Sequence, residues 1–199
     1  LAGFSASIVR AAVMFSVIAF TKILNRHSNI YNSLALSAMI LLLYNPNYLF
    51  DVGFQLSFAA VLSIVVFQPL VRKYSYSKNI AILKTKELLL ISLVAQIGVL
   101  PLSLYYFGQF PLLFLMANLI AIPLSSIILV LGLLLIPFNF LLPKVAVYLS
   151  VFVNFLIDWM NNFTAWIVQF DAFIIKNIAF HEVLVLLMYV IIGGVIYLV

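Results

Sequence analysis

The sequence predicts an all-α bundle of membrane-spanning helices, and three observations support this fold class. Hydrophobic residues make up 67% of the 199 residues, and charged residues make up only 8%. A soluble domain carries about 25% charged residues, because polar side chains must cover its surface. The apolar residues form long continuous runs, as expected where lipid forces the backbone to satisfy its own hydrogen bonds. The ten-residue alternation of a membrane β-barrel is absent.

Seven apolar runs follow one another along the chain, and we expect about six or seven of them to span the membrane. The second is short and ends at Asn45 and Pro46. The fifth is too long for one straight helix, so a break or kink is predicted just before Pro123. Pro101, near the end of the fourth run, is another candidate hinge. The runs are residues 4–24, 30–44, 48–71, 88–107, 111–142, 144–160 and 183–199.

The basic residues predict the orientation. If each run crosses once, eight of the ten lysines and arginines fall on one side of the membrane. The positive-inside rule makes that side cytoplasmic. Residues 72–87 are therefore predicted to form a basic cytoplasmic loop, with the N-terminus outside and the C-terminus inside. The eight residues are Lys22, Arg26, Arg72, Lys73, Lys78, Lys84, Lys86 and Lys144.

The chain is interpreted as a single transmembrane domain over residues 1–199, taken from a longer multi-domain membrane protein. It opens on Leu1 and enters an apolar run without the charged region or cleavage site of a signal peptide. It has no cysteine, which excludes disulfides and thiolate metal sites. No catalytic or nucleotide-binding motif occurs, so we expect no enzyme activity, no cofactor and no metal site.

Residues 161–180 leave two interpretations open. Phe163, Trp166, Ile167 and Phe170 recur at helical spacing, which suits a helix lying in the headgroup zone of the membrane. Alternatively, the sixth run continues as a helix out of the bilayer.

Arg10 is the most costly residue within the apolar runs. An arginine at the centre of a span costs about 2.5–3.5 kcal/mol on insertion scales. Its side chain either extends to the nearer membrane surface or faces the interior of the bundle. The small residues beside it, among them Ala11 and Ala12, favour helix packing and therefore the interior.

Gln55 and Ser57 pose the same choice near the start of the third run. Buried polar groups in a membrane either join neighbouring helices or line a water-filled path. Gly53 would let a neighbouring helix come close. Asn118, shortly before Pro123, is a further polar candidate, because a broken helix frees carbonyl groups that need protein or water partners.

Four segments, in this order, resemble the central membrane domain of ComEC-type competence proteins. They are GFSASIVRAAVM at residues 3–14, DVGFQLSFAAVLSIV at 51–65, LPLSLYYFGQFP at 100–111 and ANLIAIPL at 117–124. The second segment, which follows an Asn-Pro pair, is the most specific. The family's upstream helices, its external oligonucleotide-binding-type domain and its hydrolase-like domain are missing, so no nuclease activity is assigned to this chain.

The resemblance implies part of a channel that moves single-stranded DNA across the bacterial inner membrane during natural competence. It implies four kinds of partner: single-stranded DNA, the lipid bilayer, other competence-machinery proteins and the missing domains of the same chain. In this interpretation Arg10 meets phosphates, and Gln55, Ser57 and Asn118 line the path. A small-solute or ion transporter and a non-transporting membrane scaffold remain the alternatives.

Phe54 and Phe58 are candidates for stacking on DNA bases, because every base offers a π-face. They lie four residues apart in the most specific segment. Ordinary packing between helices is the alternative role for both rings.

Overall fold

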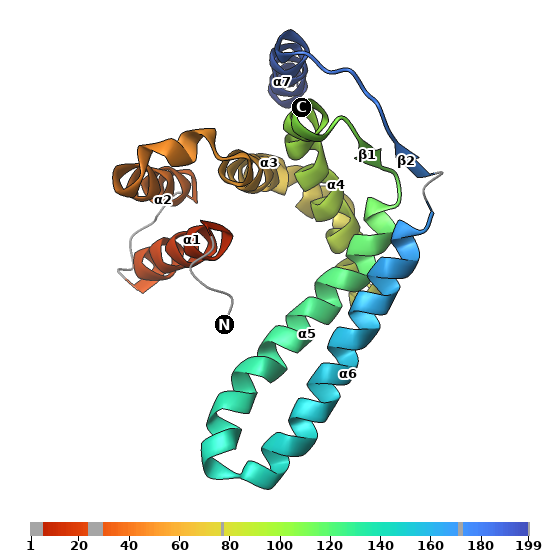
Figure 1. Cartoon of the computed structure of the whole chain (residues 1–199). Coiled ribbons are helices and arrows are strands. Elements are labelled where there is room, and N and C mark those ends of the chain that lie inside the picture. Colours follow the sequence, from red (N-terminus) through yellow and green to blue (C-terminus); the bar gives the residue numbers. More distant parts are fainter. Residues whose placement is uncertain (1–5, 24–29, 77, 171–172, 199) are drawn as a thin grey trace. The chain divides into compact units, whose positions relative to one another are not determined.

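The computed structural model describes residues 6–23, 30–76, 78–170 and 173–198. The predicted all-α fold class is confirmed there (Figure 1). Four helices, α3 to α6, are long and apolar enough to cross a membrane, by length and composition. The elements are α1 (Ala6–Ile23), α2 (Ile30–Tyr44), the 3-10 helix η1 (Pro46–Phe50), α3 (Val52–Ser75), α4 (Ile80–Phe107), β1 (Phe110–Pro111), α5 (Phe114–Leu141), α6 (Pro143–Val168), β2 (Ile174–Ile175) and α7 (Glu182–Leu198).

The chain divides into two compact units. One consists of Leu1–Gln109 and Asn177–Val199, and the other is Phe110–Lys176. The first unit contains α1 to α4, η1 and α7. The second is the α5–α6 hairpin, whose open end is closed by β1 and β2. The single transmembrane domain over residues 1–199 stays a prediction.

The core of the first unit lies between α3 and α4. Phe67 and Val71 of α3 are buried against Val94 of α4, and Ile192 of α7 packs on this cluster. The Oγ atom of Ser63 donates a hydrogen bond of 2.7 Å to the carbonyl of Val94. Apolar contact and one interhelical hydrogen bond therefore hold the two longest helices of this unit together.

The third apolar run begins as two elements. Residues 46–50 form η1, and the Asn45 side chain accepts a hydrogen bond of 3.1 Å from the Asn47 N–H at its start. Asp51 then caps α3, because its Oδ1 atom accepts from the Phe54 N–H at 2.7 Å. Asp51 thus fixes the point at which the helix carrying Gln55 begins.

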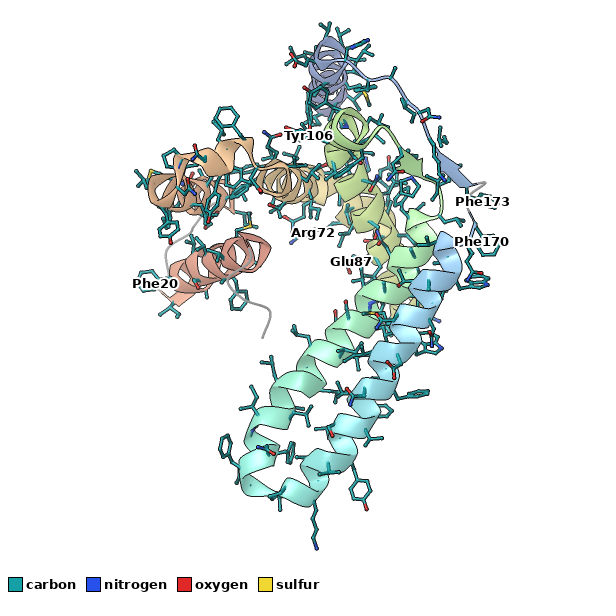
Figure 2. All side chains as sticks on the ribbon, viewed as in Figure 1. Phe20, Arg72, Glu87, Tyr106, Phe170 and Phe173 are labelled. Atoms are coloured by element: carbon teal, nitrogen blue, oxygen red, sulfur yellow. The ribbon has the colours of Figure 1, made fainter. Side chains whose placement is uncertain are left out.

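The predicted loop over residues 72–87 is wrong in its secondary structure. α3 continues to Ser75 and α4 begins at Ile80, so Arg72 and Glu87 both lie on helices (Figure 2). Arg72 and Lys73 occupy the last turn of α3, where a positive charge complements the helix dipole. Asn79 starts α4 by accepting a hydrogen bond of 2.9 Å from the Ala81 N–H. The basic stretch is therefore two helix ends with a short connection.

The predicted break before Pro123 is not found, whereas the alternative of a kink there stays a prediction. α5 is one continuous helix that includes Pro123 and Pro137. The loss of one backbone hydrogen bond at a proline costs less than exposing an irregular segment to lipid. Ser125 and Ser126 donate hydrogen bonds of 3.0 and 2.8 Å to the carbonyl of Ile122, which adds side-chain donors beside the proline. α4 likewise continues through the buried Pro101, whose hinge role stays a prediction.

For residues 161–168, the structure decides between the two interpretations of the segment 161–180. α6 runs without interruption to Val168, so residues 161–168 are its last turns and do not form a separate interfacial helix. After α6, β2 pairs antiparallel with β1, with Phe110 opposite Ile175 and Pro111 opposite Ile174. The hairpin is thereby tied at the end opposite its turn.

Candidate functional site

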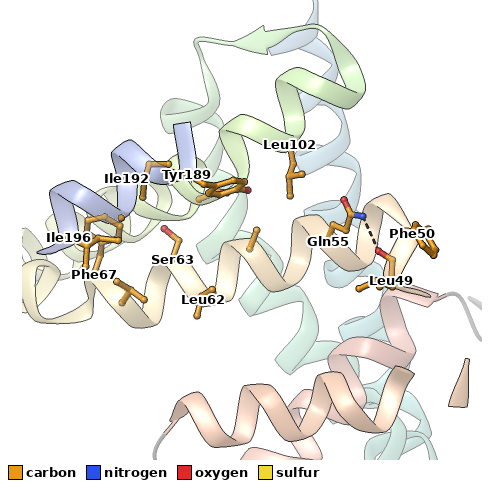
Figure 3. A pocket seen from close by; sticks show the side chains of 14 residues that line it. Leu49, Phe50, Gln55, Leu62, Ser63, Phe67, Leu102, Tyr189, Ile192 and Ile196 are labelled. Atoms are coloured by element: carbon orange, nitrogen blue, oxygen red, sulfur yellow. Dashed lines mark hydrogen bonds between the residues drawn. The ribbon is translucent and has the colours of Figure 1, made fainter. Parts of the chain in front are cut away.

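The first unit contains a cavity of about 560 Å³ between α3, α4, α7 and η1. Its size falls within the range of about 300–1,000 Å³ that ligand pockets occupy, and its wall is mostly apolar. Leu49 and Gln55 lie toward one end, and Phe67 and Ile196 lie toward the other (Figure 3).

The amide of Gln55 joins three elements at one end of the cavity. Its Nε2 atom donates a hydrogen bond of 2.9 Å to the carbonyl of Leu49 in η1. Its Oε1 atom accepts one of 2.8 Å from the hydroxyl of Tyr106 in α4. A glutamine amide has two donor hydrogens and two acceptor lone pairs. These two bonds therefore leave capacity for one more donated and one more accepted hydrogen bond.

The polar atoms in the middle of the cavity wall are directed at the α4 backbone. The hydroxyl of Tyr189 donates a hydrogen bond of 2.9 Å to the carbonyl of Gly98. Ser63 donates to Val94, one helical turn earlier in α4. Because both hydroxyl protons are used in this way, the middle of the wall presents mainly carbon to the cavity.

α4 carries two adjacent tyrosines that bind different neighbours. Tyr106 binds Gln55 of α3, whereas Tyr105 donates a hydrogen bond of 3.0 Å to a carboxylate oxygen of Glu182 in the first turn of α7. The two rings meet edge to face, with centroids 5.0 Å apart. This pair therefore connects α4 to both of the other helices that border the cavity.

The sequence did not single out Tyr105, Tyr106, Tyr189 or Gly98. The only local signal for any of them is the pair of tyrosines in the segment LPLSLYYFGQFP, which carries the family resemblance but indicates no partner for either ring. Each tyrosine binds a residue more than 50 positions away in the chain. Local spacing carries no information about such partners.

The aromatic candidates pack on each other beside the cavity. The Phe54 and Phe58 rings are tilted by 36° with centroids 4.4 Å apart, and Phe54 is only 5% exposed. Ser57 donates a hydrogen bond of 3.0 Å to the carbonyl of Phe54 within α3. None of these three described residues belongs to the cavity wall. Their roles in a DNA path stay predictions.

The remaining candidates lie elsewhere. Asn118 belongs to α5 in the second unit and lines a different cavity of about 260 Å³, together with Thr164 of α6. Gly53 is the second residue of α3. Arg10 is part of α1, but its side chain lies outside the described residues. Among the predicted site residues whose side chains are described, the structure thus places only Gln55 in the wall of the larger cavity.

Long apolar helices, a helical hairpin and a cavity between helices define the class of this molecule: a multi-pass α-helical membrane protein. The chain belongs to the Competence protein family, which it matches over residues 1–199.

One curated relative is similar over part of the chain. ComE operon protein 3 of Bacillus subtilis (strain 168) is 33% identical over 123 residues, which is 62% of this chain and 15% of the relative. The matched region is therefore a small part of that protein. No solved structure shows a significant match.

Proposed function

We propose that this chain forms part of a channel that carries single-stranded DNA across the bacterial inner membrane during natural competence. Membership of the Competence protein family is the observation that carries the proposal. The multi-pass helical architecture supports it, since a charged polymer needs a protein-lined route through lipid. No specific observation favours the alternatives, which are a small-solute carrier, an ion carrier and a scaffold.

In this proposal the cavity of the first unit borders the route, and Gln55 is its polar contact. An uptake route must bind phosphate and sugar without selecting a base sequence. The free capacity of the Gln55 amide suits such contacts. The rest of the cavity wall is mostly apolar and would bind the strand weakly, so that the strand could pass along the route. Arg10 is proposed as a phosphate contact from its place in the first apolar run, and Asn118 as a polar contact from its place in α5.

Replacement of Gln55 by leucine is expected to reduce transformation about tenfold, equivalent to a loss of about 1.4 kcal/mol of favourable interaction with the strand. The reduction should occur at an unchanged level of protein in the membrane. Both quantities can be measured in one strain, by transformant counts and by immunoblots of membrane fractions.

Tyr106→Phe is the matched control for this substitution. It removes the same interhelical hydrogen bond but leaves the Gln55 amide in the cavity wall. Transformation should therefore fall less than in Gln55→Leu. Equal losses in the two variants, or a parallel fall in protein level, would assign Gln55 to helix packing and not to the DNA route.

We also propose that the basic end of α3 and the start of α4 face the cytoplasm, because basic residues near span ends stay inside. Cysteine labelling tests this orientation. Between α3 and α4, Tyr76 is a suitable position for the cysteine because its side chain is 76% exposed, whereas the neighbouring Ser75 is buried. A cysteine at Tyr76 should react with an impermeant maleimide only after the cells are opened. A cysteine at the exposed His181 is expected on the outer side and should react in intact cells. The reverse pattern would invert the topology.

A further inference from the structure

The second unit carries a row of five aromatic rings that neither the cavity nor the DNA route uses. Three of them lie on one face of α6, the fourth follows just after the end of that helix, and the fifth lies shortly before β2. Successive ring centroids are 6.0, 6.2, 4.9 and 6.4 Å apart. We call this row the aromatic ladder: Trp159, Phe163, Trp166, Phe170 and Phe173.

All members of the aromatic ladder except Trp159 line one side of an apolar groove. Figure 2 shows Phe170 and Phe173 together where the chain leaves α6. Opposite them, the start of α5 contributes Leu113, Met116 and Leu119. The groove has a volume of about 330 Å³, and none of the described residues that line it has a charged or amide side chain. Trp166, which lines the groove, is about half exposed, at 55%. The groove is therefore built for an apolar ligand.

The length of the hairpin places this groove near the membrane surface. α5 has 28 residues and α6 has 26 residues, so they are about 42 and 39 Å long at 1.5 Å per residue. The hydrocarbon core of a bilayer is about 30 Å thick, and the bilayer with its headgroups about 40–45 Å. Lys144 marks the turn of the hairpin, and Trp166 lies 22 residues further, about 33 Å along the helix. The far end of the aromatic ladder thus reaches the headgroup zone, where tryptophan is enriched.

Aromatic rows also bind single-stranded DNA, but the charges here do not suit that ligand. A DNA-binding row is paired with basic groups that follow the phosphates. The sequence between Lys144 and Lys176 contains no lysine or arginine, and it includes Asp158. An uncharged tail fits this surface better than a phosphate backbone.

We propose that the groove between the aromatic ladder and the start of α5 holds an acyl chain of a bilayer phospholipid, close to its headgroup. The proposal does not rest on the proposed DNA route, although the groove shares Phe170 and Phe173 with the smaller cavity that Asn118 lines. The bound lipid would fill the space between the two helices at the end where they join β1 and β2.

The chain's only two tryptophans, Trp159 and Trp166, both lie on the aromatic ladder and serve as probes. The full-length protein is reconstituted into phosphatidylcholine vesicles that contain a small fraction of lipid brominated near the headgroup or near the methyl end of the acyl chain. Tryptophan fluorescence is compared with that of the double variant Trp159→Phe and Trp166→Phe, so that the difference reports the aromatic ladder. Bromine near the headgroup should quench this difference signal more strongly.

Groove occupancy is separated from general lipid contact by two leucine variants. Leu119→Phe fills the groove and should lose the quenching seen at a low fraction of brominated lipid. Leu129→Phe lies on an exposed part of α5 outside the groove and should keep it. Stronger quenching from the methyl end, equal quenching in both variants, or quenching by a single-stranded oligonucleotide but not by lipid would each overturn the proposal.

Discussion

Replacement of Gly98 by alanine is expected to destabilise the first unit, although alanine favours a helix more than glycine does. A Cβ atom at Gly98 would overlap the Cβ atom of Ser63 and lie 2.8 Å from the carbonyl oxygen of Ala59. α3 and α4 would have to separate at this contact. Overpacking of this kind costs about 1–3 kcal/mol, and the gain in helix propensity is about 1 kcal/mol. The cost exceeds the gain if the two helices cannot move apart to relieve the overlap. The buried cluster of Phe67 and Val94 on the same interface opposes such a shift.

The measurement is the thermal unfolding midpoint of the purified protein in detergent. Gly194→Ala is the control, because nothing lies within 4 Å of a Cβ atom there and α7 should be unaffected or stabilised. Combination of Gly98→Ala with Ser63→Gly should recover part of the loss, since it removes the overlapping side chain but not the Ala59 carbonyl. An unfolding midpoint for Gly98→Ala at or above that of the wild type would show that the interface is not tightly packed.

Replacement of Gly193 by leucine is expected to block DNA uptake without unfolding the protein. Gly193 lines the cavity, and a Cβ atom there meets nothing within 4 Å. A leucine side chain can therefore be accommodated, and it occupies space that the proposed route needs. If displacement of the leucine side chain by the passing strand costs about 1.4 kcal/mol or more, uptake falls about tenfold or more. Transformant counts, normalised to the protein level in the membrane, measure the effect.

Gly194→Leu is the matched control for this blockade. The adjacent glycine also meets nothing within 4 Å, but it does not line the cavity. It should leave uptake close to the wild-type level. Equal losses at the two positions would indicate damage to α7, and normal uptake in Gly193→Leu would remove the cavity from the DNA route while leaving the family's role in competence untouched.

The order and approximate positions of the helices followed from the sequence, although α4 begins before its predicted run and α6 ends after its own. Residues 30–44 were predicted as an apolar run and form α2 with the same bounds, and the run ending at Phe107 ends α4. Lipid leaves the backbone few alternatives to a helix, so continuous apolar runs predict helices well. The same rule explains why Pro123 does not end the helix, because α5 continues through it. Gln55 could be singled out for a similar reason, since an amide in an apolar run is costly without a partner.

The identity of those partners was decided only by the tertiary structure. Tyr106 lies 51 residues from Gln55, and Tyr189 lies 91 residues from the Gly98 carbonyl that it binds. Helical periodicity relates positions three or four residues apart and says nothing about which helices become neighbours. The sequence by itself therefore determined an apolar helical membrane protein and a few costly polar residues in its apolar runs, Gln55 among them. Close packing at Gly98 and the hydrogen bonds of the tyrosines determined where a cavity could form, because these contacts join segments that only folding brings together.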